Sequence, residues 1–171
     1  MILSDGDIRK MLKSGRIKIA PLSDDQIGPA SVDLTLSDEW YFFKDDLSRK
    51  IVDLKETGFA KAFDMRAGKT ITLKPGELCL GKTVERITLP DDVMGRLEGR
   101  SRYARMGVII HTTSAVVQPG SDNRQVLEIV NLAPFPIKLH AGMRISQVVF
   151  EQLESATSKP YARFGDIARG Q

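Results

Sequence analysis

Short stretches in which hydrophobic and polar residues alternate run through most of the chain, and turn residues separate them. Between residues 31 and 36, Val32, Leu34 and Leu36 alternate with serine, aspartate and threonine. Such alternation places the apolar side chains on one face of a strand. The pattern recurs in the stretches 69–100, 107–117, 124–132 and 135–153. Strands this short and this closely spaced predict a mainly β fold, a barrel or sandwich of jelly-roll type.

The first residues follow a helical pattern instead. Ser4 is a suitable N-cap and Asp7 completes a capping box. Gly15 stands where a helix commonly stops. The apolar residues between them fall on one helical face: Ile8, Met11 and Leu12. We therefore expect a short N-terminal helix and few other helical turns.

Two regions do not share these patterns. Residues 44–69 are charged and weakly periodic, which predicts an irregular arm. Residues 159–171 carry no core pattern, so we expect a mobile C-terminal tail. With 171 residues, of which 42% are hydrophobic, the chain is long enough for one domain over 1–171 with a real core.

The overall charge excludes some partners. The formal net charge is +3, from 25 Lys and Arg against 22 Asp and Glu, and there is no polybasic run. This balance does not favour a nucleic acid or a membrane surface as the partner. The N-terminus shows no signal-peptide pattern, and no stretch reaches the ~20 apolar residues of a membrane span. With a single cysteine and no possible intrachain disulfide, we expect a cytoplasmic protein.

The same inventory excludes several kinds of chemistry. One cysteine and two histidines, His111 and His140, cannot supply the ligands of a zinc-dependent nucleobase deaminase. Cys79 lies within an apolar alternation and is expected to be a buried, unreactive thiol. Neither a Walker loop nor a Gly-x-Gly-x-x-Gly motif is present.

A basic stretch bracketed by glycines, "GRSRYARMG" at 99–107, is the first candidate site. If it forms two helical turns, Ser101 caps them, and Ser101 and Arg105 lie on one face at positions i and i+4. With Arg100 just before, the unpaired N–H groups of the helix start would bind phosphate. The alternative is a solvated surface turn.

A carboxylate inside an apolar stripe is the second candidate. On a strand, Glu128 shares its face with Val126 and Val130. Acidic residues are rare in such positions unless they are paired or functional. Desolvation there would raise the pKa of Glu128 toward the range of a general acid and base. An ion pair or an exposed barrel edge is the alternative.

The third candidate is the hairpin predicted by Pro119 and Gly120. Two strands that meet at this turn would present backbone N–H and C=O groups to a pocket, and these groups could read a planar base. An ordinary surface turn is the alternative.

Taken in order, the motifs resemble those of the dCTP deaminase family, which shares a superfamily with the trimeric dUTPases. The resemblance covers nearly the whole chain. It is carried by "MILSDGDIRKMLKSGRIKI", "IGPASVDLTLSDEW", "LKPGELCLGKTVERITLPDDVMGRLEGRS", "GRSRYAR" and "QVLEIVN". It implies a dUTPase-like β-barrel that forms homotrimers with active sites between subunits. It also implies hydrolysis of the 4-amino group of dCTP without zinc, as part of the supply of dUMP and dTTP. Mg²⁺ would be bound to the triphosphate and not to a protein metal site. The resemblance suggests dTTP as an inhibitor.

The resemblance also implies roles for individual residues. Glu128 would be the general base and acid, Ser101 would position the attacking water, and Arg105 would stabilise charge. The tail that contains Tyr161 would close over the nucleotide. The nucleotide-binding positions that it implies are Arg100, Ser101, Arg102, Tyr103, Ala104, Arg105, Gln118, Val126, Leu127, Glu128, Gln147 and Tyr161.

Four departures from the family pattern keep other functions open. Arg102 replaces the second serine of the signature, and Ser121 replaces an aromatic residue after Pro-Gly. Gln118 stands where bifunctional relatives carry an aspartate that activates water, and an amide is not a base. The tail reads "GDIAR" in place of Gly-Lys-Tyr. The alternatives to a dCTP deaminase are a bifunctional enzyme that forms dUMP and a nucleotide-binding paralogue without catalysis.

Overall fold

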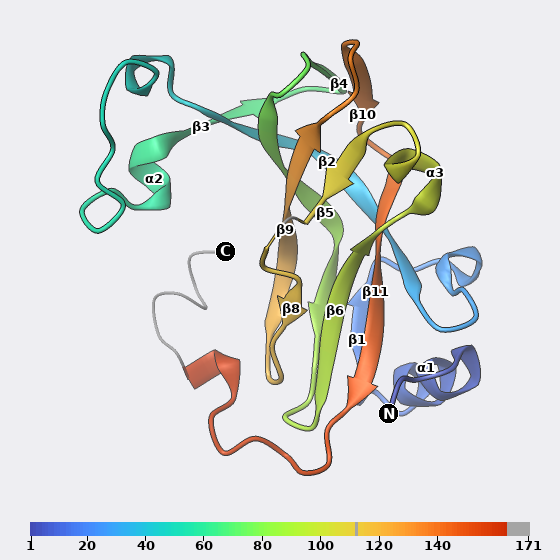
Figure 1. Cartoon of the computed structure of the whole chain (residues 1–171). Helices are drawn as coiled ribbons and strands as arrows, with labels where there is room; N and C mark the ends of the chain where they lie inside the picture. Colours follow the sequence, from blue (N-terminus) through green and yellow to red (C-terminus); the bar gives the residue numbers. More distant parts are fainter. Residues whose placement is uncertain (112, 164–171) are drawn as a thin grey trace.

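A computed structural model describes residues 1–111 and 113–163 (Figure 1). The strands are β1 (Lys18–Ala20), β2 (Val32–Phe43), β3 (Phe63–Ala67), β4 (Thr70–Leu73), β5 (Leu78–Thr88), β6 (Val93–Gly99), β7 (Val108–Ile110), β8 (Val116–Val117), β9 (Asp122–Asn131), β10 (Ile137–His140) and β11 (Arg144–Gln152). The helices are α1 (Asp5–Lys13), α2 (Phe59–Ala62) and α3 (Ser101–Ala104), and the 3-10 turns are η1 (Asp24–Gln26), η2 (Asp45–Leu47) and η3 (Tyr161–Arg163).

Antiparallel pairing joins nine strands into one curled sheet. Its order is β7-β9-β5-β2-β11-β6-β8, with β1 paired to β5 and β3 paired to β2, while β4 and β10 form a separate ladder. In Figure 1 the sheet curves around a central space, which the apolar side chains fill. The mainly β, barrel-like architecture expected from the alternation is therefore confirmed.

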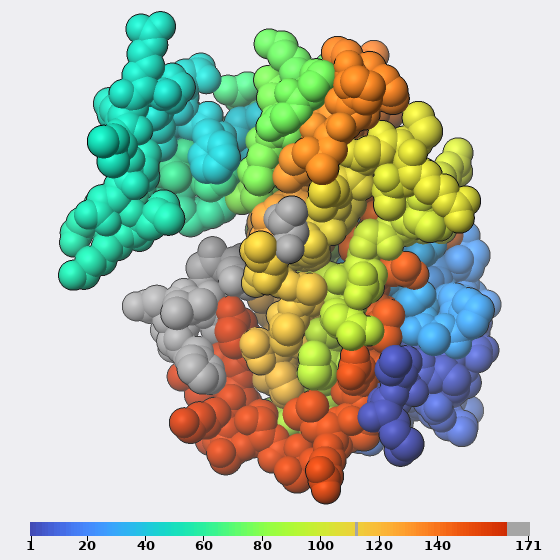
Figure 2. All heavy atoms as spheres, in the orientation of Figure 1, coloured from blue at the N-terminus to red at the C-terminus, as the bar shows by residue number. Residues whose placement is uncertain are grey.

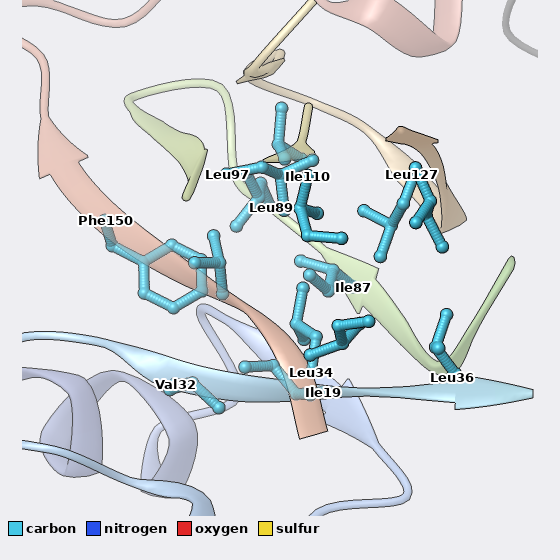
Figure 3. Close-up of a cluster of buried hydrophobic side chains, with 14 of the residues drawn as sticks. Ile19, Val32, Leu34, Leu36, Ile87, Leu89, Leu97, Ile110, Leu127 and Phe150 are labelled. Atoms are coloured by element: carbon cyan, nitrogen blue, oxygen red, sulfur yellow. The ribbon is translucent and has the colours of Figure 1, made fainter. Parts of the chain in front are cut away.

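The core follows the alternation residue by residue. Val32, Leu34 and Leu36 on β2 are fully buried, as predicted, and Figure 3 shows them facing side chains of β5, β9 and β11. The layers lie so close at Gly81 that a Cβ there would come within 2.9 Å of both Ile129 and Leu36. A side chain at this position would force the core apart.

The N-terminal helix also forms as predicted. The Ser4 hydroxyl accepts a hydrogen bond from the Asp7 amide at 3.3 Å and donates one to the Asp7 carboxylate at 2.8 Å. Gly15 ends the helix with φ of +72°. The capping box thus satisfies donors that the first turn would otherwise leave unpaired.

The arm is more regular than expected. Residues 63–67 form β3, paired antiparallel with residues 39–43 of β2, so the expectation of an irregular segment up to residue 69 was wrong there. The remaining residues, 44–62, project away from the barrel in Figure 1 and end in α2. Aromatic packing holds this arm, because the Phe59 ring stacks on that of Phe63 with centroids 5.0 Å apart.

Candidate active site

A pocket of about 600 Å³ opens where two strands of the predicted hairpin separate. β7 pairs with β9 up to Ile110 and Ile129. The His111 amide makes one more bond to β9, at the Glu128 carbonyl, and further along the chain β8 pairs with β6 instead of β9. The two hairpin strands meet again at the turn, where the Ser121 amide donates to the Gln118 carbonyl oxygen at 3.2 Å. The pocket therefore lies between splayed strands that are joined at both ends.

The walls of the pocket come from four parts of the chain. The hairpin, the sheet face of β2, β5 and β6, the arm and the C-terminal segment each contribute side chains. Figure 2 shows the arm and residues 153–163 on the same side of the molecule. The described residues that line it are Tyr41, Phe59, Leu80, Lys82, Leu97, His111, Ser114, Val116, Val117, Gln118, Ser121, Asn123, Gln125, Val126, Glu128 and Tyr161.

Glu128 lies in this pocket, on the face predicted from the alternation. Its side chain is 27% exposed. Across the sheet it stands opposite Leu80 of β5, and on its own strand it lies between Val126 and Val130. The carboxylate is thus partly withdrawn from water but open to a ligand, which are the conditions that general acid–base catalysis needs.

His111 forms a hydrogen bond with this carboxylate. Its Nδ1 lies 2.7 Å from Glu128 Oε2, and its side chain is only 3% exposed. The residue has φ of +57°, an uncommon conformation for anything but glycine. Its buried Nε2 has no hydrogen-bond partner among the described residues. The backbone joins the same two residues, because the His111 amide donates to the Glu128 carbonyl at 2.9 Å.

Sequence reasoning missed His111, which it considered only as a zinc ligand. A signal was present in the hairpin. Positions 111 and 128 lie equally far from the Pro119–Gly120 turn, so an antiparallel register centred on that turn places them opposite each other. The turn predicted at Pro119–Gly120 is present, with a φ of +76° at Gly120, but the strand just before it, β8, pairs with β6 and not with β9.

The cysteine, the acidic and histidine side chains and the helices each bear on an expectation from the sequence. Cys79 is fully buried, and burial raises the pKa of its thiol to about 12, so the expectation of an unreactive side chain is supported. Within residues 1–111 and 113–163, no cluster of three or more His, Cys, Asp or Glu side chains could hold a metal ion. None of the described helices is long and apolar enough to span a membrane.

The glycine-bracketed stretch forms a shorter helix than expected. α3 is limited to Ser101–Ala104, and its N-cap is Arg100, in an extended conformation and without a side-chain capping bond. The expectation that Ser101 caps two turns was therefore wrong. The Arg105 amide donates to the Ser101 carbonyl at 3.0 Å, so these residues stand one turn apart as predicted, and both are exposed.

Two further predicted phosphate ligands are engaged within the chain. Arg100 lies 3.2 Å from the Asp33 carboxylate and donates to the Arg144 carbonyl at 3.1 Å. Burial raises the pKa of Asp33, and the Arg100 charge opposes that rise. Gln147 accepts a hydrogen bond from the Ser31 hydroxyl at 2.8 Å and donates to the Gly99 carbonyl at 3.2 Å. These contacts fix the loop that presents α3.

The predicted nucleotide-binding residues fall into two groups in one chain. Gln118, Val126, Glu128 and Tyr161 line the pocket, and Leu127 next to them is buried in the core. The second group lies outside this pocket: Arg100, Ser101, Arg102, Tyr103, Ala104, Arg105 and Gln147. Figure 1 shows α3 on one side of β9 and the arm on the other. A single chain therefore does not bring the two groups together.

The start of the C-terminal tail packs against the hairpin. The Tyr161 amide donates to the Pro119 carbonyl at 2.9 Å, and a Cβ on Gly120 would lie 2.7 Å from Pro160. These contacts place Tyr161 at the pocket wall. Residues 164–171, including "GDIAR", lie outside the described residues, so closure of the tail over a nucleotide stays a prediction.

Comparisons with known proteins place this geometry in a family context. The family described as dCTP deaminase-like matches residues 2–153. The dCTP deaminase of Rhodospirillum rubrum is 44% identical over 174 residues, covering 95% of this chain and 88% of its own length. The "dCTP deaminase, dUMP-forming" of Kocuria rhizophila is 37% identical and covers 100% of this chain and 91% of its own. The protein of the same name from Dictyoglomus thermophilum is 40% identical and covers 94% of this chain and 85% of its own length.

Solved structures agree on the fold. The 2'-deoxycytidine 5'-triphosphate deaminase of Agrobacterium tumefaciens matches with a TM-score of 0.68 and 24% identity, over 88% of this chain and 48% of that one. A dUTPase of Staphylococcus bacteriophage 80alpha matches with a TM-score of 0.52 and 15% identity, over 87% of this chain and 97% of that one. The dUTPase-like form of the expected barrel is thereby confirmed.

Proposed function

The chain belongs to the dCTP deaminase-like family, and from that premise we propose that it is an enzyme that hydrolyses dCTP to dUTP and ammonia. The observation that carries the proposal is the Glu128 carboxylate, which lines a nucleoside-sized pocket and is bonded to a buried histidine. Relatives named dCTP deaminase at 37–44% identity support the substrate.

The proposed mechanism uses Glu128 twice. The carboxylate removes a proton from water as the water oxygen bonds to C4 of the pyrimidine, and the electron pair of the N3–C4 double bond moves to N3 and, by resonance, to the 2-carbonyl oxygen. The protonated Glu128 then returns the proton to the 4-amino group, the electron pair re-forms the N3–C4 double bond, and ammonia leaves as the C4–N bond to the amino group breaks. Transfer of the 4-hydroxyl proton to N3 completes the uracil ring. General acid–base catalysis of this kind contributes about 10²–10⁴ in rate.

The second group of residues would complete the site from a neighbouring subunit. We propose a homotrimer in which Ser101 positions the water and Arg105 stabilises charge, while Arg100, Gln147 and the backbone of α3 bind the triphosphate. The exposure of Ser101 and Arg105 in a single chain supports this arrangement. Among the described residues, Glu128 is the one carboxylate that lines the pocket, and it is bonded to His111. A single carboxylate does not suit a resident metal, so Mg²⁺ would bind through phosphate oxygens of the nucleotide.

A dUMP-forming reaction is the second candidate. Several relatives, at 37–40% identity, carry "dUMP-forming" in their names. Against it stands Gln118, which lines the pocket but cannot act as a base toward water. The products separate the two possibilities: dUTP indicates deamination alone, whereas dUMP with pyrophosphate indicates the bifunctional reaction. Including dTTP in the same assay tests whether it inhibits.

Ammonia release from dCTP and Mg²⁺ tests the main proposal. Glu128→Gln keeps the shape of the side chain and removes its basicity, so kcat should fall by at least about 10²-fold while the nucleotide still binds. Tight dCTP binding by the unaltered protein without ammonia would favour the non-catalytic paralogue. Normal turnover of dCTP by Glu128→Gln would contradict the proposed mechanism.

A further inference from the structure

Lys82 shares the pocket with Glu128 and has no role in the mechanism above. In the β5–β9 ladder, Lys82 stands opposite Val126, and Leu80 stands opposite Glu128. Lys82 and Glu128 are therefore diagonal neighbours on the same face of the sheet, with Cβ atoms within about 7–8 Å of each other. Both side chains line the pocket.

The ammonium of Lys82 is poorly satisfied within the chain. Its side chain is 21% exposed, so most of it is removed from water. Its nearest anionic partner is Glu39 Oε2 at 3.8 Å, which exceeds the length of a hydrogen bond. Lys82 donates no hydrogen bond to any residue in the described part of the chain, although an ammonium has three N–H donors.

Glu39 does not need Lys82 as its partner. Its other carboxylate oxygen accepts a hydrogen bond from the Arg124 guanidinium at 2.6 Å. Burial raises the pKa of Glu39, but the Arg124 hydrogen bond and the charges of Arg124 and Lys82 bring it below its usual value. One carboxylate thus faces two cations. Because Arg124 makes the close contact, the Lys82 ammonium remains available to a ligand in the pocket.

Chemistry selects the group that Lys82 would bind. The phosphate-binding candidates lie elsewhere, on and around α3, so the part of the nucleotide beside Glu128 is the pyrimidine. Lys82 can only donate hydrogen bonds. On a cytosine whose C4 faces Glu128, the 2-carbonyl oxygen is an acceptor two ring positions from C4, and a diagonal neighbour of Glu128 can reach it.

We propose that Lys82 is a further catalytic residue, whose ammonium donates a hydrogen bond to the pyrimidine 2-carbonyl oxygen and stabilises the negative charge that reaches it when water adds to C4. No covalent bond to Lys82 forms, and its proton stays on nitrogen. The donor acts where charge develops in the transition state, so it lowers the barrier more than it strengthens ground-state binding. This inference rests on the proposed deamination of dCTP.

The test combines a protein change with a substrate change. Lys82→Met keeps the length of the side chain and removes the donor, and Lys138→Met, at an exposed strand lysine on β10, is the matched control. For Lys82→Met we expect kcat on dCTP to fall about 10- to 100-fold, less than the 10²–10³ of a fully preorganised donor. The control should keep its activity, and thermal melting checks that both variants fold.

The substrate arm identifies the atom that Lys82 contacts. In 2-thio-dCTP a sulfur atom, a weaker acceptor, replaces the 2-carbonyl oxygen. If Lys82 binds this atom, replacing oxygen by sulfur lowers kcat of the unaltered enzyme by a larger factor than it lowers kcat of the Lys82→Met variant. An equal replacement effect in both proteins, or normal turnover of dCTP by Lys82→Met, would overturn the inference. Absence of ammonia from the unaltered enzyme would instead overturn the proposed function on which it rests.

Discussion

At the scale of single residues, the Glu128–His111 contact is the feature with the most consequences. A 2.7 Å hydrogen bond between an imidazole and a carboxylate fixes the direction in which the carboxylate points. Because His111 is almost fully buried, its ring has little freedom to turn away. We therefore expect His111 to hold Glu128 in position for the incoming water.

His111→Asn tests this positioning role. Asparagine tolerates the positive φ at this position, so backbone strain is kept low, but its shorter side chain does not span the distance to Glu128. We expect kcat to fall about 10- to 100-fold, as for the loss of a hydrogen bond to a charged group, with a smaller change in KM. Steady-state kinetics and a melting curve measure both effects. Unchanged kcat in a folded variant would show that the contact is only structural.

The two residues also show what sequence can and cannot predict. The face of Glu128 followed from strand periodicity alone, because its neighbours at two-residue spacing are both valine. The role of His111 depended on the register between two strands, which is a property of the pair rather than of either strand. Lys82 was missed for the same reason, since its relation to Glu128 exists only across the ladder.

At the scale of elements, local signals predicted those parts that local forces determine. The capping box of α1 formed because its hydrogen bonds join neighbours in sequence. β3 was missed because its pairing with β2 stabilises residues whose own sequence is charged and weakly periodic. α3 is shorter than expected because, after Ala104, the amides of Met106 and Gly107 donate to carbonyls only three residues back, and the chain then turns at Gly107, where φ is +81°.

Gly107 is therefore expected to be essential to the geometry after α3. A Cβ there would lie 2.8 Å from the Ala133 backbone nitrogen, which cannot move aside easily. Gly76 is the matched control, because its φ is +80° and a Cβ added there would meet no atom within 4 Å. We expect Gly76→Ala to cost about 1–2 kcal/mol from the left-handed conformation.

Gly107→Ala adds a steric clash to the same strain, so its cost should be about 2–5 kcal/mol. Urea unfolding of both variants at one fixed protein concentration measures the difference. Equal losses of stability in the two variants would mean that the backbone at Ala133 moves aside without cost. The close approach of Gly107 to Ala133 would then not be the reason for a glycine at this turn.

At the scale of the whole molecule, the main fact is the separation of the two residue groups. Glu128 and Tyr161 line the pocket, whereas Ser101 and Arg105 are exposed on another part of the surface. A rigid β-barrel cannot bring them together within one chain. If both groups serve one reaction, the second must come from another copy of the chain, as a heterologous interface in a closed ring allows.

This arrangement predicts that two inactive variants restore activity to each other. Glu128→Gln removes the base and Arg105→Ala removes the charge-stabilising residue, and we expect each variant alone to release little ammonia. In a random mixture of a cyclic trimer, about one quarter of the sites combine an intact Glu128 with an intact Arg105 from the neighbour. Co-expression of the two variants should therefore recover about that fraction of the unaltered rate. The same proteins mixed after separate purification, without subunit exchange, are the control. If co-expressed variants that are shown to assemble together recover no activity, the site does not lie between subunits, and the residues around α3 must serve a purpose other than this reaction.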